Sequence, residues 1–263
     1  MSYSTIALER GDDGVAILTL NRPNAANSIN DVLAREFMLA ATACDDDPSV
    51  RAVVLTGAGT VFCLGGDLKA FGAAGADLKG KLKEITVYLH AGIARLTRMN
   101  APVVAAVNGI AAGAGFSLAA AADFTIAADS ASFVMAYTNA GLAPDGSSTY
   151  FLPRRIGDRR ARELMLTNRM LSANEALDWG VVNQVVPAAE LMDVALGQAR
   201  RFAQGPTLAF GAVKQLLNAS FDNGLETQME LESRAIADMS ATHDGGEGIA
   251  AFLAKRKPAF KGN

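Results

Sequence analysis

Continuous apolar runs are the feature that most constrains the fold of this chain. Residues 52–56 (AVVLT) and 102–107 (PVVAAV) carry no charged side chain. Such runs are typical of strands in a sheet that is covered on both faces. Between them, residues 79–99 repeat apolar side chains at helical spacing. Strand, helix and strand at this spacing predict βαβ units and a mostly parallel sheet.

The neighbouring segments continue the α/β pattern. Residues 15–21 (VAILTLN) form a β-branched run that predicts a strand. A helix is predicted over residues 30–44, with Asn30 as its N-cap. A small-residue helix at 113–122 and a strand at 123–128 follow the second buried run. Every α/β unit up to this point therefore supports the same sheet.

The last third of the chain has a different pattern. After about residue 150 strand signals fade and helices dominate. We therefore expect an α/β core over residues 1–200 and a helical C-terminal portion over 201–263 that takes part in oligomerisation. The predicted helices of this region are 159–166, 173–179, 188–203, 206–219, 225–239 and 247–254.

Composition excludes several classes of function. The net charge is −3, which argues against a nucleic-acid surface. The two cysteines form no CxxC pair, which fits a reducing cytosol, and the two histidines are far apart, which leaves little to build a metal site. The N-terminus does not resemble a signal peptide, and the most apolar stretch, 101–128, is interrupted by Asn108 and Asp123. We expect a cytoplasmic protein without membrane, nucleic-acid or metal partners.

Two glycine-rich segments follow predicted strands. They are 57–68 (GAGTVFCLGGDL) and 108–119 (NGIAAGAGFSLA). Glycine lets a ligand approach backbone N–H groups, and a helix N-terminus adds positive potential. Neither segment is a dinucleotide fingerprint or a P-loop. From glycine content alone, ligand binding and tight strand–helix packing are both open.

Several segments together resemble the enoyl-CoA hydratase/isomerase (crotonase) superfamily. They are NRPNAANSIN, VVLTGAGTVFCLGGDL, PVVAAVNGIAAGAGFSLAAAADFTIAADSASF, GLAPDGSSTYFLPRRIG and LSANEALDWGVVNQVV, with the end at FLAKRKPAF. The resemblance covers essentially the whole chain. It implies a crotonase-like α/β fold of repeated ββα units, an acyl-CoA thioester substrate with no other cofactor, and a homo-oligomer, a trimer or dimer of trimers.

Two subgroups of this superfamily are most similar in detail. RRARELMLTNR, at 159–169, resembles 4-chlorobenzoyl-CoA dehalogenases. GLAPD and FVMAY instead resemble ring-1,2-epoxyphenylacetyl-CoA isomerases. The resemblance is specific for fold and thioester binding, whereas one scaffold of this kind supports several reactions.

The resemblance implies an oxyanion hole made by the backbone N–H groups of Gly66 and Ala114. An enolate oxygen needs hydrogen-bond donors that are aimed before the reaction starts. Ala114 stands where members of the family often carry glycine, which is a mild departure because only its N–H group is used.

The catalytic positions depart from those of the hydratases. Where hydratases of the family carry two glutamates, this chain has Ser117 and Tyr137. Water addition needs a base for the water and an acid for the α-carbon, and neither residue is a carboxylate. A standard hydratase is therefore disfavoured, although both positions are expected in the acyl pocket.

Asp145 stands in a Pro-Asp-Gly turn, where aspartate is often only the cap of the following helix. The resemblance implies instead that Asp145 is the catalytic carboxylate. His90 lies at the flank of a predicted apolar stripe and suits a surface position, yet the dehalogenase resemblance implies a functional histidine in the acyl pocket.

Five weaker candidates concern coenzyme A. Arg22, Lys69 and Lys257 could meet its phosphates, with solvated surface as the alternative. Phe62 and Phe260 could flank the pantetheine or the adenine, with the protein core as the alternative.

The sequence thus predicts an acyl-CoA isomerase in which Asp145 moves a proton through an enolate. One alternative is an aryl-CoA dehalogenase or hydrolase in which Asp145 is the nucleophile and His90 activates water. The other is a non-catalytic homologue that only binds acyl-CoA.

Overall fold

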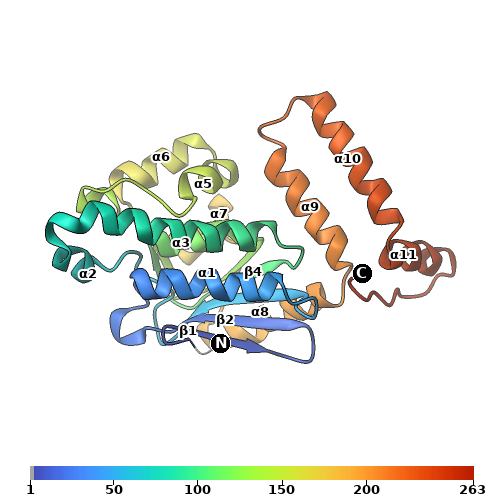
Figure 1. Ribbon diagram of the computed structural model, residues 1–263, viewed down its shortest axis with the longest axis horizontal. Helices are drawn as coiled ribbons and strands as arrows, with labels where there is room; N and C mark the ends of the chain where they lie inside the picture. The colour runs from blue at the N-terminus through green and yellow to red at the C-terminus, as the bar shows by residue number, and fades with distance from the viewer. Residues whose placement is uncertain (1–2) are drawn as a thin grey trace.

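The computed structural model describes residues 3–263, and its centre is a six-stranded sheet (Figure 1). The strand order is β1-β2-β3-β4-β6-β9. β1 and β2 are antiparallel, and all the other neighbours are parallel, so the predicted mostly parallel sheet is confirmed. The strands are β1 (Ile6–Arg10), β2 (Val15–Leu20), β3 (Ala52–Gly57), β4 (Val103–Val107), β6 (Phe124–Ala128) and β9 (Gln184–Val186).

Helices pack against this sheet, whose central strands are buried throughout. Every residue of β3 and β4 is buried. Helix α8 (Leu191–Ala203) packs against β2, β3, β4 and β6. Helices α1 (Asp31–Asp45) and α3 (Leu78–Arg98) lie side by side (Figure 1). Asn30 caps α1 as predicted, because its side chain accepts a hydrogen bond from the Leu33 N–H at 2.9 Å.

A second, three-stranded sheet was not predicted. It contains β5 (Ile110–Ala112), β7 (Ser132–Val134) and β8 (Leu171–Ser172). These strands are too short to show a period of two in the sequence. β8 and β9 also correct the expectation that strands end near residue 150. β5 runs directly into α4 (Ala114–Ala121), so this small sheet positions the start of that helix.

Several short elements lie around the glycine-rich loop and beyond the sheets. The glycine-rich segment 57–68 leads into a short helix that was not predicted, α2 (Leu68–Ala73). Asp67 caps α2 by accepting from the Ala70 N–H at 3.1 Å. The other helices before α8 are α5 (Ser148–Ile156), α6 (Asp158–Thr167) and α7 (Ala173–Trp179), with 3₁₀ turns at Pro23–Ala25, Gly75–Asp77, Thr138–Ala140 and Ala188–Glu190.

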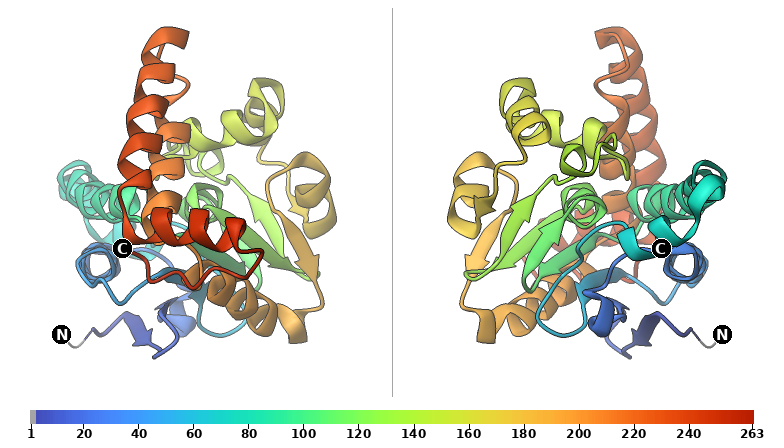
Figure 2. Two further views of the ribbon diagram at one scale, coloured as in Figure 1. Left: turned by 90° about the vertical axis from the view of Figure 1, so that its right-hand side faces the viewer. Right: turned by 90° about the vertical axis from the view of Figure 1, so that its left-hand side faces the viewer.

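The C-terminal helices stand away from the main sheet (Figures 1 and 2). They are α9 (Thr207–Ala219), α10 (Leu225–Ser240) and α11 (His243–Leu253). α11 begins at His243 rather than at residue 247, because Thr242 caps it by accepting from the Gly245 N–H at 2.9 Å. No helix within residues 3–263 is long and apolar enough to cross a membrane.

A buried lysine fastens α9 to the core. Only 7% of the Lys214 side chain is exposed, and its Nζ lies 2.7 Å from Oδ2 of Asp123. The same ammonium donates to the carbonyl oxygens of Leu96 and Ala101 at 2.9 and 3.0 Å. One side chain therefore joins α9 to the end of α3 and to the segments that precede β4 and β6.

Replacing this lysine should weaken the fold. Lys214→Met leaves Asp123 and two carbonyl groups without their partner, so we expect the free energy of unfolding to fall by about 2–4 kcal/mol. Denaturant titration measures this change. Lys83→Met, an exposed lysine on α3, is the matched control and should change stability by less than about 0.5 kcal/mol. Equal stability of the two variants would contradict the anchoring role of Lys214.

Candidate active site

Gly66, Ala114, Tyr137 and Asp145 line one cavity of about 280 Å³. They come from four separate segments: the loop before α2, the start of α4, the turn after β7 and the turn before α5. The rest of the wall is largely apolar and includes Ile29, Leu68, Phe71, Leu82, Ile85 and Leu89. The cavity therefore suits an apolar group that presents one polar atom.

Two backbone amide groups of residues that line this cavity have no hydrogen-bond acceptor within residues 3–263. Neither the Gly66 nor the Ala114 N–H donates a hydrogen bond to another residue within 3–263. Ala114 is the first residue of α4, where backbone N–H groups have no helical acceptor. A Cβ atom on Gly65 would lie 2.9 Å from the Ala112 oxygen and 3.1 Å from the Ala114 nitrogen. Glycine at 65, with φ +83°, is therefore what lets the two loops approach.

The carboxylate of Asp145 does not cap a helix. α5 begins at Ser148, its N-cap is Ser147, and no side chain caps it. Instead, Oδ1 of Asp145 accepts the hydroxyl of Tyr137 at 2.6 Å, and Oδ2 lies 3.8 Å from Nε2 of His90. The side chain is 28% exposed. The cap interpretation of Asp145 is therefore wrong, and its carboxylate is available to the cavity.

Tyr137 holds one oxygen of this carboxylate. Burial and the negative charge of Asp145 both raise the pKa of Tyr137 above its usual value. The phenol therefore stays protonated at neutral pH and remains a donor. Oδ1 accepts this bond, whereas Oδ2 is the oxygen of Asp145 that lies toward His90.

Ser117 lies behind the turn that carries Asp145 rather than in the cavity wall. Its side chain is fully buried, and its hydroxyl donates to the backbone oxygen of Asp145 at 2.9 Å. It also lies 3.2 Å from the Gly113 oxygen. The expectation that Ser117 lines the acyl pocket is corrected: this hydroxyl supports the backbone on which Asp145 stands.

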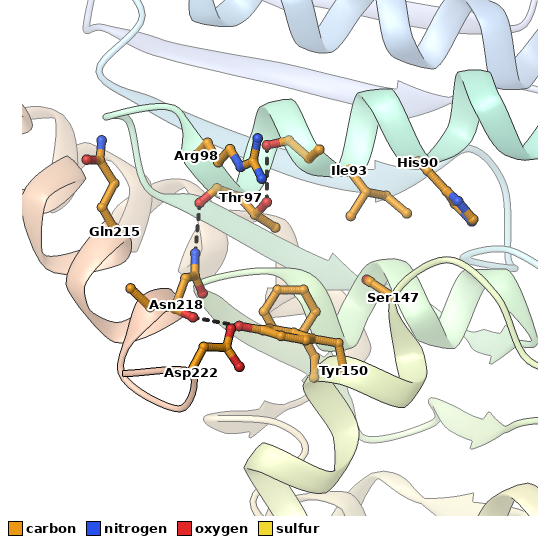
Figure 3. Close-up of a pocket in the computed structure, with 12 residues that line it drawn as sticks. His90, Ile93, Thr97, Arg98, Ser147, Tyr150, Gln215, Asn218 and Asp222 are labelled. Atoms are coloured by element: carbon orange, nitrogen blue, oxygen red, sulfur yellow. Dashed lines mark hydrogen bonds between the residues drawn. The ribbon is translucent and has the colours of Figure 1, made fainter. Parts of the chain in front are cut away.

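His90 lies at the border of a second cavity, of about 840 Å³, between α3, α5 and α9 (Figure 3). The Gly146 N–H donates to Nε2 of His90 at 3.2 Å. Nε2 is therefore the acceptor in this contact. The far wall of this cavity is held by the Tyr150 hydroxyl, which donates to the Asn218 oxygen at 2.6 Å.

None of the five coenzyme A candidates lines either cavity. Phe62 is completely buried, so it belongs to the core and cannot stack on a ligand. Lys257 and Phe260 lie in the C-terminal tail, where the Phe260 ring packs beside Gly248 of α11. Asp244 holds this tail by accepting from the N–H groups of residues 261 and 262, both at 2.7 Å. Lys257 and Phe260 therefore line neither cavity of their own chain.

Arg22 and Lys69 differ in what they contact. The guanidinium of Arg22 lies 3.0 Å from Oδ2 of Asp67, whereas Lys69 is exposed on α2. This role of Asp67 was not predicted, because the helix that Asp67 caps was not expected in this segment. Within residues 3–263, no three His, Cys, Asp or Glu side chains gather as a metal site would require.

Comparisons with known proteins identify the family of this chain. A family profile described as Enoyl-CoA hydratase/isomerase matches residues 10–263. The 1,2-epoxyphenylacetyl-CoA isomerase of Escherichia coli is 41% identical, over 97% of this chain and 98% of its own. The 4-chlorobenzoyl coenzyme A dehalogenase-1 of Arthrobacter sp. is 38% identical, over 92% and 88%.

A solved structure confirms the fold. The enoyl-CoA hydratase from Polaromonas sp. JS666 superimposes with a TM-score of 0.92 at 36% identity and covers 97% of this chain and 99% of that one. The expected crotonase-like fold, with its helical C-terminal portion, and the resemblance to isomerases and dehalogenases are thus confirmed. The chain belongs to the enoyl-CoA hydratase/isomerase family.

Proposed function

We propose that this enzyme is an acyl-CoA isomerase that moves a double bond by proton transfer through a thioester enolate. The observation that carries the proposal is the set of residues that line the smaller cavity. Asp145 is the only carboxylate among its lining residues, and it shares the wall with Gly66 and Ala114, whose N–H groups are free. One base and one pair of oxyanion donors are what a 1,3-proton shift requires.

The thioester carbonyl would bind between the Gly66 and Ala114 amides. Negative charge develops on this oxygen when a proton leaves the acyl chain. Removing one such donor typically costs about 2.7–4 kcal/mol in transition-state stabilisation. The positive end of α4 adds to this field because Ala114 is its first residue.

Asp145 would then act as both base and acid. Oδ2 takes a proton from the α- or γ-carbon, and the C–H electrons move toward the thioester, whose oxygen becomes the enolate. The protonated Asp145 returns the proton two carbons away, and the double bond has moved. The Tyr137 hydroxyl keeps Oδ1 in place at 2.6 Å while Oδ2 reacts.

Hydration is the reaction that this site supports least. The two positions that carry glutamates in hydratases hold Ser117 and Tyr137. The Ser117 hydroxyl donates to a backbone oxygen, and the Tyr137 hydroxyl donates to Asp145, so neither is a base that could activate water.

A dehalogenase or hydrolase is the second candidate, because His90 lies only 3.8 Å from Asp145. It would need the nearby nitrogen of His90 to accept a proton from water. That nitrogen already accepts from the Gly146 N–H, which favours the isomerase. Halide release from a halobenzoyl-CoA thioester would support the second candidate. A non-catalytic homologue would bind thioesters without halide release or solvent exchange.

The role of Asp145 can be tested by one conservative change. Asp145→Asn keeps an oxygen for the Tyr137 hydroxyl but removes the proton acceptor, so we expect turnover to fall by about 10²–10⁴. Solvent-deuterium exchange into the acyl chain should be lost while acyl-CoA affinity changes little. Asp158→Asn, an exposed carboxylate on α6, is the matched control. If Asp145→Asn exchanged deuterium at the parental rate, Asp145 would not be the base, and His90 would be the next residue to test.

Hydration of crotonyl-CoA should be very weak. Without carboxylates at positions 117 and 137, we expect a rate at least about 10²-fold below that of hydratases in the family. Loss of the enoyl-thioester absorbance measures this reaction, with an authentic hydratase as the positive control. Ordinary hydratase turnover would overturn the assignment of these two positions.

We also propose that the protein is a homo-oligomer, a trimer or a dimer of trimers. Within residues 3–263, α10 has no buried residue, although Leu225, Met229 and Ile236 are apolar. Leaving such a surface in water is unfavourable, so a partner subunit is expected to cover it. Lys257 and Phe260 could then approach the site of a neighbouring subunit.

Light scattering at micromolar concentration tests this assembly. We expect a mass of three or six chains, and Ile236→Asp should shift the distribution toward smaller species. Lys83→Met serves again as the surface control. A uniform monomer of the parental protein would rule the assembly out.

A further inference from the structure

The loop that carries Gly66, residues 64–67, forms a short ladder of backbone hydrogen bonds with the neighbouring loop, residues 26–29. The Leu64 N–H donates to the Ala26 oxygen at 3.1 Å. Ile29 then bonds on both sides of Gly66: its N–H donates to the Gly65 oxygen at 2.7 Å, and its oxygen accepts from the Asp67 N–H at 3.0 Å. In a parallel bridge of this kind the residue between the two bonds directs its own N–H to the opposite side. This pairing turns the Gly66 N–H away from Ile29.

Arg22 fastens the end of this ladder. Its Nη1 donates to the Ser28 oxygen and to Oδ2 of Asp67, the latter at 3.0 Å. The side chains are 20% and 14% exposed, so this ion pair is partly shielded from water. Oδ1 of Asp67 meanwhile accepts from the Ala70 N–H of α2. Asp67, directly after Gly66, is thus fixed from both sides.

We infer that Arg22 is a positioning residue for the oxyanion hole, which it orients through Asp67 and the Gly66 peptide, and is not a ligand of a coenzyme A phosphate. The inference rests on the proposed function, because it assigns a purpose to the direction of the Gly66 N–H. Oxyanion donors work only when they are aimed before the reaction, and a displacement of about 1 Å can cost on the order of 10²-fold in rate.

Two variants separate the positioning role from phosphate binding. Arg22→Met removes the cation. Asp67→Asn keeps it but offers one acceptor oxygen to two donors, Arg22 and the Ala70 N–H. If Arg22 bound phosphate, Asp67→Asn would free it and strengthen coenzyme A binding. If Arg22 positions the loop, both variants impair the same step.

The kinetic test uses one acyl group on coenzyme A and on pantetheine, which lacks the phosphates. We expect both variants to lower kcat by about tenfold or more on both thioesters, with KM changed by less than about threefold. Lys69→Met is the charge control, and any effect it has should be confined to KM for the coenzyme A thioester.

A spectroscopic readout distinguishes failure of this inference from failure of the proposed function. The infrared carbonyl frequency of a bound, saturated, ¹³C-labelled acyl-CoA reports polarisation by the two amides whether or not Asp145 moves a proton. We expect a lowered frequency in the parent and a smaller lowering in Arg22→Met and Asp67→Asn. If the carbonyl frequency were not lowered in the parental protein, the proposed oxyanion hole itself would be contradicted.

The inference about Arg22 is overturned by a different pattern. In that pattern the parental frequency is lowered, Arg22→Met keeps the lowering, and KM rises for the coenzyme A thioester alone. Should Arg22→Met fail to fold in a thermal-unfolding check, Asp67→Asn decides: parental kcat and parental carbonyl frequency in that variant contradict the positioning role.

Discussion

The site depends on the close approach of two backbone segments that have almost no side chains between them. A Cβ atom on Gly115 would lie 2.2 Å from the Cys63 oxygen, and one on Gly65 would lie 2.9 Å from the Ala112 oxygen. Any larger residue at either position would push α4 away from the loop before α2. This contact brings the Gly66 and Ala114 amides into one cavity. Each sheet positions one of the two segments, since β3 leads into the loop before α2 and β5 leads into α4.

The chemistry then depends on one carboxylate in an otherwise apolar wall. Tyr137 stays protonated because burial and the charge of Asp145 raise its pKa, and it occupies only one of the two carboxylate oxygens. Ser117 and Ser148 donate to the backbone oxygen of Asp145, which fixes the turn. A residue in a turn that would ordinarily cap a helix thereby lines the cavity, where we propose that it is the base.

The sequence predicted the long periodic helices and strands well. It predicted the short strands and the contacts between distant segments poorly. Helix α1 with its Asn30 cap and the buried strand β4 carry strong local signals, whereas β5 and β7 have three residues each and are stabilised by pairing across the chain. The family resemblance grouped Asp145 with the amides of Gly66 and Ala114, and these three residues line one cavity. It could not show that Phe62 is core or that Arg22 pairs with Asp67, because both depend on distant contacts.

A crystal structure with a bound, non-reacting acyl-CoA tests the central claim most directly. We expect the thioester oxygen within about 3.1 Å of the Gly66 and Ala114 nitrogens, with Oδ2 of Asp145 beside the α- or γ-carbon, close enough for proton transfer. A thioester that binds elsewhere, or whose carbonyl points away from both amides while Asp145 faces only solvent, would contradict the account.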